Sequence, residues 1–212
     1  MGDILIIDTA TNTLRKTEKE YTIAEYKVQG KWPFDYISGK GLVSVVEQHA
    51  KMLNRKLTGL EIGICKGENI VHFLENLHEY VEKIHCIDPY LPYMDWIGPV
   101  TQDVVNEHKR IAIENFIPWS DKITMNIATS DEMVAKYPDD TFDWLFIDGD
   151  HSYQATKNDI VNYYSKVKSG GIFSGHDFNL PEVSRAVIEF CQQIRIREIK
   201  TTDVNVWYWI KP

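Results

Sequence analysis

The stretch FDWLFIDGDHSY, residues 142–153, joins a run of mostly apolar residues to a group of polar ones. A strand that is packed on both faces reads as a nearly continuous apolar run, as residues 142–147 do. Asp148, Asp150 and His151 crowd around Gly149 directly after this run. In open α/β sheets, ligands bind just beyond the carboxyl ends of the strands. The stretch therefore predicts a buried strand that ends in a functional site.

On both sides of this stretch, short β-rich runs alternate with helix-length amphipathic runs. We expect strands near 57–64, 83–88, 122–128, 142–148 and 171–177. We expect helices near 41–54, 68–80, 101–116, 131–137, 153–168 and 181–195. This alternation is typical of βαβ units and of a mostly parallel sheet. The sequence therefore predicts an α/β, Rossmann-like, doubly wound domain over residues 41–212, with helices on both faces of the sheet.

The end of the chain departs from this alternation. The β-like runs 196–201 and 205–211 are separated by only three residues. A parallel crossover needs a dozen or more residues, so the two runs are predicted to pair antiparallel. A dinucleotide-dependent dehydrogenase would continue with another βαβ unit at this point.

Residues 1–40 have a different pattern. The apolar runs 4–8 and 21–28 are predicted to pair as a hairpin across residues 9–20, and residues 31–41 read as a loop that carries three aromatic residues. We interpret this region as an N-terminal arm. It either packs on the main domain, joins two subunits of a homodimer, or covers the substrate pocket as a lid.

Composition and charge restrict the classes of partner. The 212 residues carry a formal net charge of −8, which disfavours nucleic acid and anionic membrane surfaces as partners. No apolar run approaches the roughly 20 residues that a membrane-spanning helix needs. Three cysteines without the spacing of a metal site favour reduced thiols. We therefore expect a cytoplasmic protein that acts on a small molecule.

The first predicted core strand runs into two glycines. Glu61, Gly63 and Gly67 lie in the segment EIGICKG, and glycine at a strand-to-helix turn allows a ligand to approach the backbone closely. Glu61 would repel a pyrophosphate and attract a cation such as an ammonium or sulfonium group. Asp88 ends the second strand, where an acidic side chain can accept both hydroxyls of a ribose. These residues together describe a site for a cationic nucleoside; the alternatives are a purely structural turn at the glycines and a turn residue at Asp88.

Four segments in this order resemble one enzyme family. LEIGICKGENI, CIDPY, FDWLFIDGDHSY and SGGIFSGHDF are similar to the motifs of the class I S-adenosylmethionine-dependent methyltransferases. The closest likeness is to the small-molecule branch that includes the macrocin and catechol O-methyltransferases, with its IDGDHSY and GHD segments. The resemblance covers residues 41–212 and implies a seven-stranded sheet in which the last strand is inserted antiparallel.

The resemblance also implies roles for individual residues in binding S-adenosylmethionine. Glu61, Gly63 and Gly67 would hold the methionine part, and Asp88 the ribose. The segment 128–130, with Thr129 and Ser130, would meet the adenine edge. Ser130 reads equally well as a helix N-cap, because two acidic residues follow it. Asp148 is assigned to the cofactor site as well as to the acceptor site.

The acceptor site is predicted from side chains that follow the fourth and fifth strands: Asp148, Asp150, His151, His176 and Asp177. Three interpretations stay open. Metal-dependent members of the branch imply that Asp148, His176 and Asp177 hold a divalent ion, Mg²⁺ or Mn²⁺. Alternatively, His151 or His176 acts as a general base that a neighbouring carboxylate orients. The third interpretation is structural: the acids form a turn around Gly149, and the histidines bond to the backbone.

The function expected from these residues and from the resemblance is methyl transfer to a small molecule. The acceptor atom is expected to be a hydroxyl oxygen of a sugar, a nucleotide-sugar or a natural product. The alternatives are a metal-dependent hydroxylase-like enzyme and a non-catalytic module that binds S-adenosylmethionine. Tyr90, Tyr93 and Trp96, after the second strand, are interpreted either as an aromatic wall near the cofactor or as loop packing.

Overall fold

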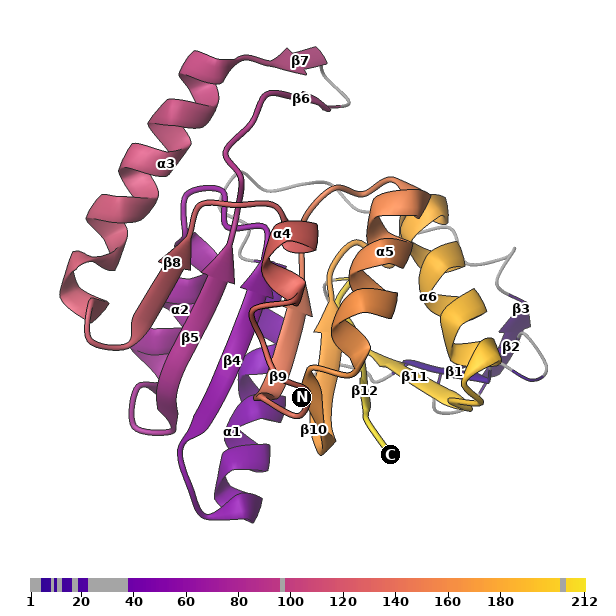
Figure 1. The fold of residues 1–212 in the computed structure, drawn as a ribbon. Helices are drawn as coiled ribbons and strands as arrows, with labels where there is room; N and C mark the ends of the chain where they lie inside the picture. Colours follow the sequence, from indigo (N-terminus) through magenta and orange to yellow (C-terminus); the bar gives the residue numbers. More distant parts are fainter. Residues whose placement is uncertain are drawn as a thin grey trace.

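A computed structural model of the chain describes residues 5–8, 10, 13–16, 19–22, 38–95, 98–202 and 205–212. Its centre is a seven-stranded mixed sheet flanked by helices (Figure 1). The strands of this sheet are β4 (Leu57–Ile62), β5 (Val81–Ile87), β8 (Ile123–Asn126), β9 (Phe142–Ile147), β10 (Val167–Gly175), β11 (Glu198–Thr201) and β12 (Trp207–Ile210). The helices are α1 (Val43–Leu53), α2 (Glu68–Leu77), α3 (Gln102–Phe116), α4 (Ser130–Val134), α5 (Tyr153–Tyr164) and α6 (Pro181–Gln193). The Rossmann-like doubly wound fold predicted from the sequence is confirmed.

The strand order places a topological switch point at the centre of the sheet. The order is β11-β12-β10-β9-β4-β5-β8, and β10, β9, β4, β5 and β8 pair in parallel. From β4 the chain builds outward through β5 to β8 and then crosses back to β9 on the other side of β4. Ligands of open α/β sheets bind at such a point, outside the carboxyl ends of the strands.

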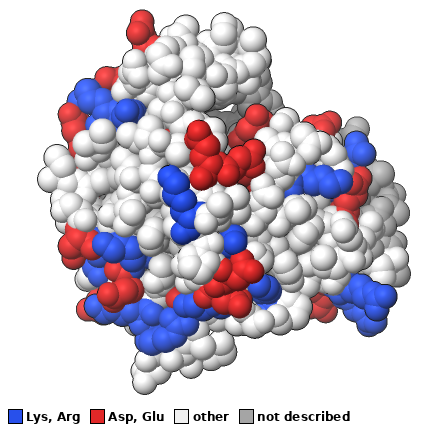
Figure 2. Space-filling model, in the orientation of Figure 1, with Lys and Arg blue, Asp and Glu red and all other residues white. Residues whose placement is uncertain are grey.

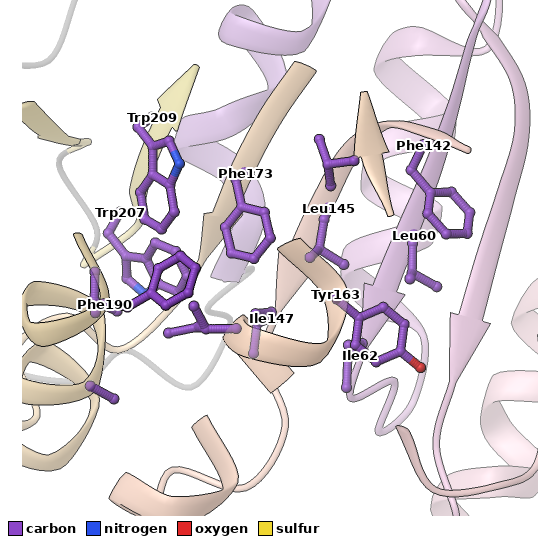
Figure 3. Packing of buried hydrophobic residues seen from close by; sticks show 14 of the residues in the cluster. Leu60, Ile62, Phe142, Leu145, Ile147, Tyr163, Phe173, Phe190, Trp207 and Trp209 are labelled. Atoms are coloured by element: carbon purple, nitrogen blue, oxygen red, sulfur yellow. The ribbon is translucent and has the colours of Figure 1, made fainter. Parts of the chain in front are cut away.

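The terminal hairpin is also confirmed. β11 pairs with β12 antiparallel, and β12 pairs antiparallel with β10, so the last strand lies inside the sheet between β10 and β11. Trp207 and Trp209 of β12 are buried against Phe173 and Phe190 (Figure 3). This aromatic packing fixes the inserted strand, because burying large apolar side chains contributes about 1.5–3 kcal/mol each.

Apolar side chains alternate between the two faces of the sheet. Leu60, Ile62 and Leu145 pack in a cluster with residues of α4, α5 and α6. Trp144 and Phe146 stand on either side of Leu145 in β9 and therefore point to the opposite face. They pack in a second cluster with residues of α1, α2 and α3. The helices therefore form one layer on each face, as Figure 1 shows. Both faces of β9 are buried, as its nearly continuous apolar pattern predicted; Asp143 is the one charged residue of the strand.

The predicted N-terminal hairpin, in which residues 4–8 pair with residues 21–28, is wrong about the strand that pairs with the first run. Strand β1 (Leu5–Asp8) pairs antiparallel with β2 (Thr13–Lys16), and β2 pairs with β3 (Lys19–Thr22). Residues 13–16 were expected to lie in the connection between the two paired runs. β1 also pairs antiparallel with β11, so these strands extend the sheet to ten strands. Trp32, Phe34 and Tyr36, the aromatic residues of the expected loop, lie outside the described residues.

Three further boundaries differ from the sequence-based prediction. Residues 38–42 form a 3-10 helix, η2 (Ser38–Leu42), before α1 begins at Val43. α5 ends at Tyr164 and β10 already begins at Val167; the register of β10 with β9 is irregular between Val167 and Ile172, where Gly170 and Gly171 lie. A short hairpin of β6 (Tyr93–Asp95) and β7 (Gly98–Val100) stands apart from the main sheet before α3. Among the described residues, no helix has the length and apolar character needed to cross a membrane.

Candidate functional site

The sequence-predicted site residues gather at one edge of the sheet. Gly63 follows β4, Asp88 follows β5, Asp148 follows β9 and His176 follows β10. These four strands are parallel neighbours, so their carboxyl ends lie side by side. The switch point between β4 and β9 is at the middle of this edge.

The turn after β4 depends on its glycines. Gly63 has a φ of +90°, and a Cβ atom there would lie 2.1 Å from the backbone oxygen of Asp148. Gly67 has a φ of +75° at the N-cap of α2, and its missing Cβ leaves room for the ring of Phe116. Cys65, between them, also has a positive φ of 49°. A non-glycine residue in this conformation stores backbone strain, which is concentrated at functional sites.

Asp88 holds the glycine turn through its carboxylate. Its Oδ2 accepts hydrogen bonds from the backbone N–H groups of Ile64 at 2.9 Å and Cys65 at 3.1 Å, and its Oδ1 accepts one from the N–H of Tyr90 at 2.8 Å. The hydroxyl of Tyr90 donates to the carbonyl of Cys65 at 2.9 Å. These contacts are compatible with a structural role of Asp88 in the turn and also with a role in binding a ligand, since each carboxylate oxygen can accept more than one hydrogen bond.

Tyr90 belongs to this packing rather than to an open aromatic wall. Its side chain is buried, whereas Tyr93 in the β6–β7 hairpin is about half exposed. Trp96, the third aromatic residue of the expected wall, lies outside the described residues.

Glu61 is a buried carboxylate close to this turn. Its side chain lies at the end of β4, and its Oε2 accepts a 2.8 Å hydrogen bond from Nδ2 of Asn69. Burial and the nearby charge of Asp148 raise the pKa of Glu61 well above its ordinary value, and the hydrogen bond from Asn69 opposes this shift. A cation bound beside Glu61 would offset the cost of the buried charge.

The segment after β8 forms a helix cap. Thr129, and not Ser130 as the sequence suggested, is the N-cap of α4, in a capping box with Glu132. The hydroxyl of Ser130 donates to Oδ1 of Asp159 at 2.5 Å. The side chains of both Thr129 and Ser130 therefore already have protein partners.

His176 is clamped between two carboxylates. Its Nδ1 lies 3.4 Å from Oδ1 of Asp148 and 3.2 Å from Oδ2 of Asp177, and only 5% of its side chain is exposed. Its carbonyl accepts a hydrogen bond from the indole N–H of Trp207. Although burial alone lowers it, the two carboxylates raise the pKa of His176 to about 10. His176 is therefore an imidazolium at neutral pH.

His151 lies on the solvent side of the same cluster. Its Nε2 is 2.9 Å from Oδ2 of Asp177, and 39% of its side chain is exposed. The hydrogen bond to Asp177 raises the pKa of His151 above its ordinary value. Burial alone would raise the pKa of Asp177, but its hydrogen bonds to the two histidines hold it below the usual range. Asp150 stays apart, since its Oδ1 accepts the backbone N–H of Ser152 in a turn.

One group of side chains could hold a metal ion. Asp148, His151 and Asp177 each offer a ligand atom, and these three atoms lie within 4.8 Å of one another. The predicted set contained His176 in place of His151. His176 touches both carboxylates of the group, but it is the more deeply buried of the two histidines.

Asn69 is the polar residue of this site that the sequence did not reveal. It is 7% exposed, although asparagine is usually found at the surface. Its place two residues after Gly67, at the start of a helix, was the available signal, because side chains of the first helical turn point back toward the preceding strand end.

Comparisons with known proteins agree with this geometry. A family model described as a methyltransferase domain matches residues 60–178, more than half of the chain. The solved structure of the O-methyltransferase NovP is similar with a TM-score of 0.62 and 20% identity over 85% of this chain and 84% of that one. An O-methyltransferase from Bacillus cereus in complex with SAH is similar with a TM-score of 0.57 and 14% identity over 89% and 86%. A comparison of the sequence with curated proteins finds no match.

Proposed function

Because the chain belongs to the family of methyltransferase domains, we propose that it transfers a methyl group from S-adenosylmethionine to a hydroxyl oxygen of a small molecule. One observation carries the acceptor half of this proposal. Two histidines and two carboxylates meet at the carboxyl ends of β9 and β10, beside the glycine turn of β4. Such a cluster can bind a hydroxyl group and take its proton.

The residues at the β4 and β5 ends fit S-adenosylmethionine. The glycine turn lets a ligand approach the backbone, and the carboxylate of Glu61 suits the cationic amino-acid part. We assign the ribose hydroxyls to Asp88, at the end of β5, and the adenine edge to Thr129 and Ser130, which follow β8. The bound cofactor would supply an electrophilic methyl group.

His151 is the residue that we propose as the general base. Its Nε2–H donates to Asp177, so Nδ1 carries the free lone pair. Asp177 fixes the orientation of the ring, as a carboxylate does for the histidine of a catalytic triad. His176 is unsuited to this task, because it is already protonated at neutral pH; its positive charge instead holds Asp148 and Asp177 together.

A divalent ion such as Mg²⁺ or Mn²⁺ is the alternative means of activating the acceptor. Two carboxylates and one imidazole, from Asp148, Asp177 and His151, are a suitable donor set. A bound ion would lower the pKa of the acceptor hydroxyl. The two means differ in their response to chelators, which abolish only the second.

The surroundings of the site favour an uncharged small acceptor. In Figure 2 the lobe where Figure 1 places the β6–β7 hairpin is largely free of charged side chains, and acidic side chains lie directly below it. Met94 of this hairpin is 75% exposed. A sugar or a natural product without phosphate groups fits this setting better than a nucleotide-sugar or a nucleic acid. Cytoplasmic location and dimerisation through the N-terminal arm stay predictions.

Calorimetric titration with S-adenosylhomocysteine tests the cofactor assignment. We expect micromolar binding to the purified protein, and no binding of NADH as the control ligand. The titration is repeated with added Mg²⁺ or Mn²⁺ to measure whether cofactor binding requires a metal. Methyl transfer from S-adenosylmethionine to a panel of acceptors, with and without the same ions, measures whether the reaction requires one. If the protein binds NADH and not S-adenosylhomocysteine, the proposed function is wrong; if it binds the latter but transfers no methyl group to any acceptor, it is a binding module.

Asp88→Ala is expected to weaken binding of S-adenosylhomocysteine by roughly 10- to 100-fold, the range for losing a hydrogen bond to a charged group. The variant would lose a ribose acceptor and would release two backbone N–H groups of the glycine turn. Titration of the purified variant measures the change. Asp103→Ala, an exposed residue in the first turn of α3, is the matched control. Unchanged affinity in Asp88→Ala would refute the ribose assignment.

A further inference from the structure

Asn69 bridges Glu61 to a segment far away in the sequence. It is the second residue of α2, and its amide is buried between two partners. Nδ2 donates to Oε2 of Glu61 at 2.8 Å, and Oδ1 accepts the backbone N–H of Gly39 at 2.8 Å. The amide thus connects the end of β4 to η2, the 3-10 helix that precedes α1.

The chemistry of the two partners fixes the orientation of this amide. A backbone N–H only donates hydrogen bonds, so the N–H of Gly39 requires Oδ1 of Asn69 on its side and leaves Nδ2 to donate to the carboxyl group of Glu61. The side chain in between must therefore offer a donor on one side and an acceptor on the other. Asparagine does so, and at position 69 a flipped amide would lose both bonds. The orientation follows from the partners and not from the placement of indistinguishable atoms.

Gly39 leaves no space for the amide to move away. A Cβ atom at position 39 would meet Oδ1 of Asn69 at 2.4 Å and the ring of Phe73 at 2.6 Å. Leu42, the last residue of η2, is completely buried in the cluster that contains Ile70 and Phe73 of α2. This packing holds η2 against α2. The carboxylate of Glu61 is therefore held by an amide that is itself held by a second element.

We propose that Asn69 is a positioning residue that fixes the carboxylate of Glu61 for the cationic amino-acid part of the bound nucleoside, and that Gly39 keeps Asn69 in place. This inference rests on the proposed function, since it assumes a ligand with such a cation. It predicts that changes at Asn69 affect recognition of the amino-acid part and spare recognition of the nucleoside part. A merely structural residue would affect both parts equally.

Asn69→Leu tests this inference, because it removes both the donor to Glu61 and the acceptor for Gly39 but keeps the approximate size of the side chain. The two probes are S-adenosylhomocysteine and 5′-methylthioadenosine, which shares the nucleoside and lacks the amino-acid part. We expect the variant to bind S-adenosylhomocysteine roughly 10- to 100-fold more weakly than the wild type, which corresponds to one hydrogen bond to a charged group. Its affinity for 5′-methylthioadenosine should stay unchanged. Asn76→Leu, at an exposed position of the same helix where the amide hydrogen-bonds to His72, is the control.

Gly39→Ala is a second variant, which perturbs the amide of Asn69 from η2. The added methyl group should displace the Asn69 side chain and produce the same selective loss, which also decides the matter if Asn69→Leu fails to fold. Equal losses for both probes, or no loss in folded variants, would overturn the inference. If wild-type protein binds neither probe, the proposed function fails first, and the positioning role fails with it.

Discussion

His151→Ala should lower the rate of methyl transfer by roughly 10²- to 10⁴-fold, the usual contribution of a positioned general base. Binding of S-adenosylhomocysteine should stay at the wild-type level, because His151 lies after β9 and not at the glycine turn. The reason for the loss is geometric. Asp177 holds the ring through Nε2, and the other imidazole of the cluster, His176, is buried beside two carboxylates that raise its pKa to about 10.

The measurement is the rate of S-adenosylhomocysteine formation, with the acceptor that reacts fastest in a panel of hydroxylated compounds. The assay is run with a chelator and again with added Mg²⁺ or Mn²⁺. His78→Ala, at the exposed C-terminal end of α2, is the matched control. A wild-type rate in His151→Ala would rule out His151 as the base. Wild-type activity that vanishes with the chelator would transfer the role to a metal ion.

The sheet edge at which the candidate site lies could be predicted from the sequence. The apolar residues of the core strands give way there to glycine or to acidic residues. β9 is apolar on both faces and then meets Asp148, and β4 runs directly into Gly63. Parallel strands place such ends side by side, so the local pattern already implies the proximity of distant residues. The segments at these strand ends resemble those of methyltransferases, and a methyltransferase-domain model matches residues 60–178.

The N-terminal strands could not be predicted in the same way. Residues 13–16 read TLRK, without the apolar alternation of a half-buried strand. Their pairing with β1 extends the sheet at an edge formed by β11, which lies almost two hundred residues later in the chain. Edge pairing of this kind depends on backbone groups left free by another strand, and side-chain patterns report on it only weakly.

The difference between the two histidines was equally hidden. His151 and His176 each stand beside an acid in the sequence, and either could be a base or a ligand. The indole N–H of Trp207 bonds to the carbonyl of His176, and Nδ1 of the buried His176 ring lies beside the carboxylates of Asp148 and Asp177. This environment, assembled from β9, β10 and β12, buries His176 and leaves His151 partly exposed.

Asp177→Asn should alter the pH dependence of both stability and turnover. Asp177 is a buried carboxylate that contacts both histidines, and its φ of +57° suits asparagine as a replacement. Removing one partner of a buried ion pair costs roughly 3–5 kcal/mol, and the retained amide oxygen places this variant at the lower end of that range. Asp150→Asn, which keeps its turn with Ser152, is the control at the same sheet edge.

The sign of the stability effect follows from the pKa shifts. The pKa of His176 is raised from 6.5 to about 10, so its charge contributes stability that is complete below pH 6.5 and is lost as the pH rises to about 10. The pKa of Asp177 is lowered from 3.8, so its contribution is complete above that pH and is lost on further acidification. The difference in free energy of unfolding between wild type and Asp177→Asn should therefore be largest near pH 5 and shrink toward pH 10. Urea unfolding at a series of pH values measures it.

The turnover profile of the same variant should move in a defined direction. A general base works in its neutral form, so the wild-type rate should rise with pH through the raised pKa of His151. Asparagine removes the carboxylate that raises this pKa, and the rising limb should shift to lower pH, with a lower plateau because the ring is less well oriented. The profile is recorded with a chelator present, so that metal binding does not contribute. A limb that stays in place, or that moves to higher pH, would mean that the group that titrates in the rate is not His151 held by Asp177.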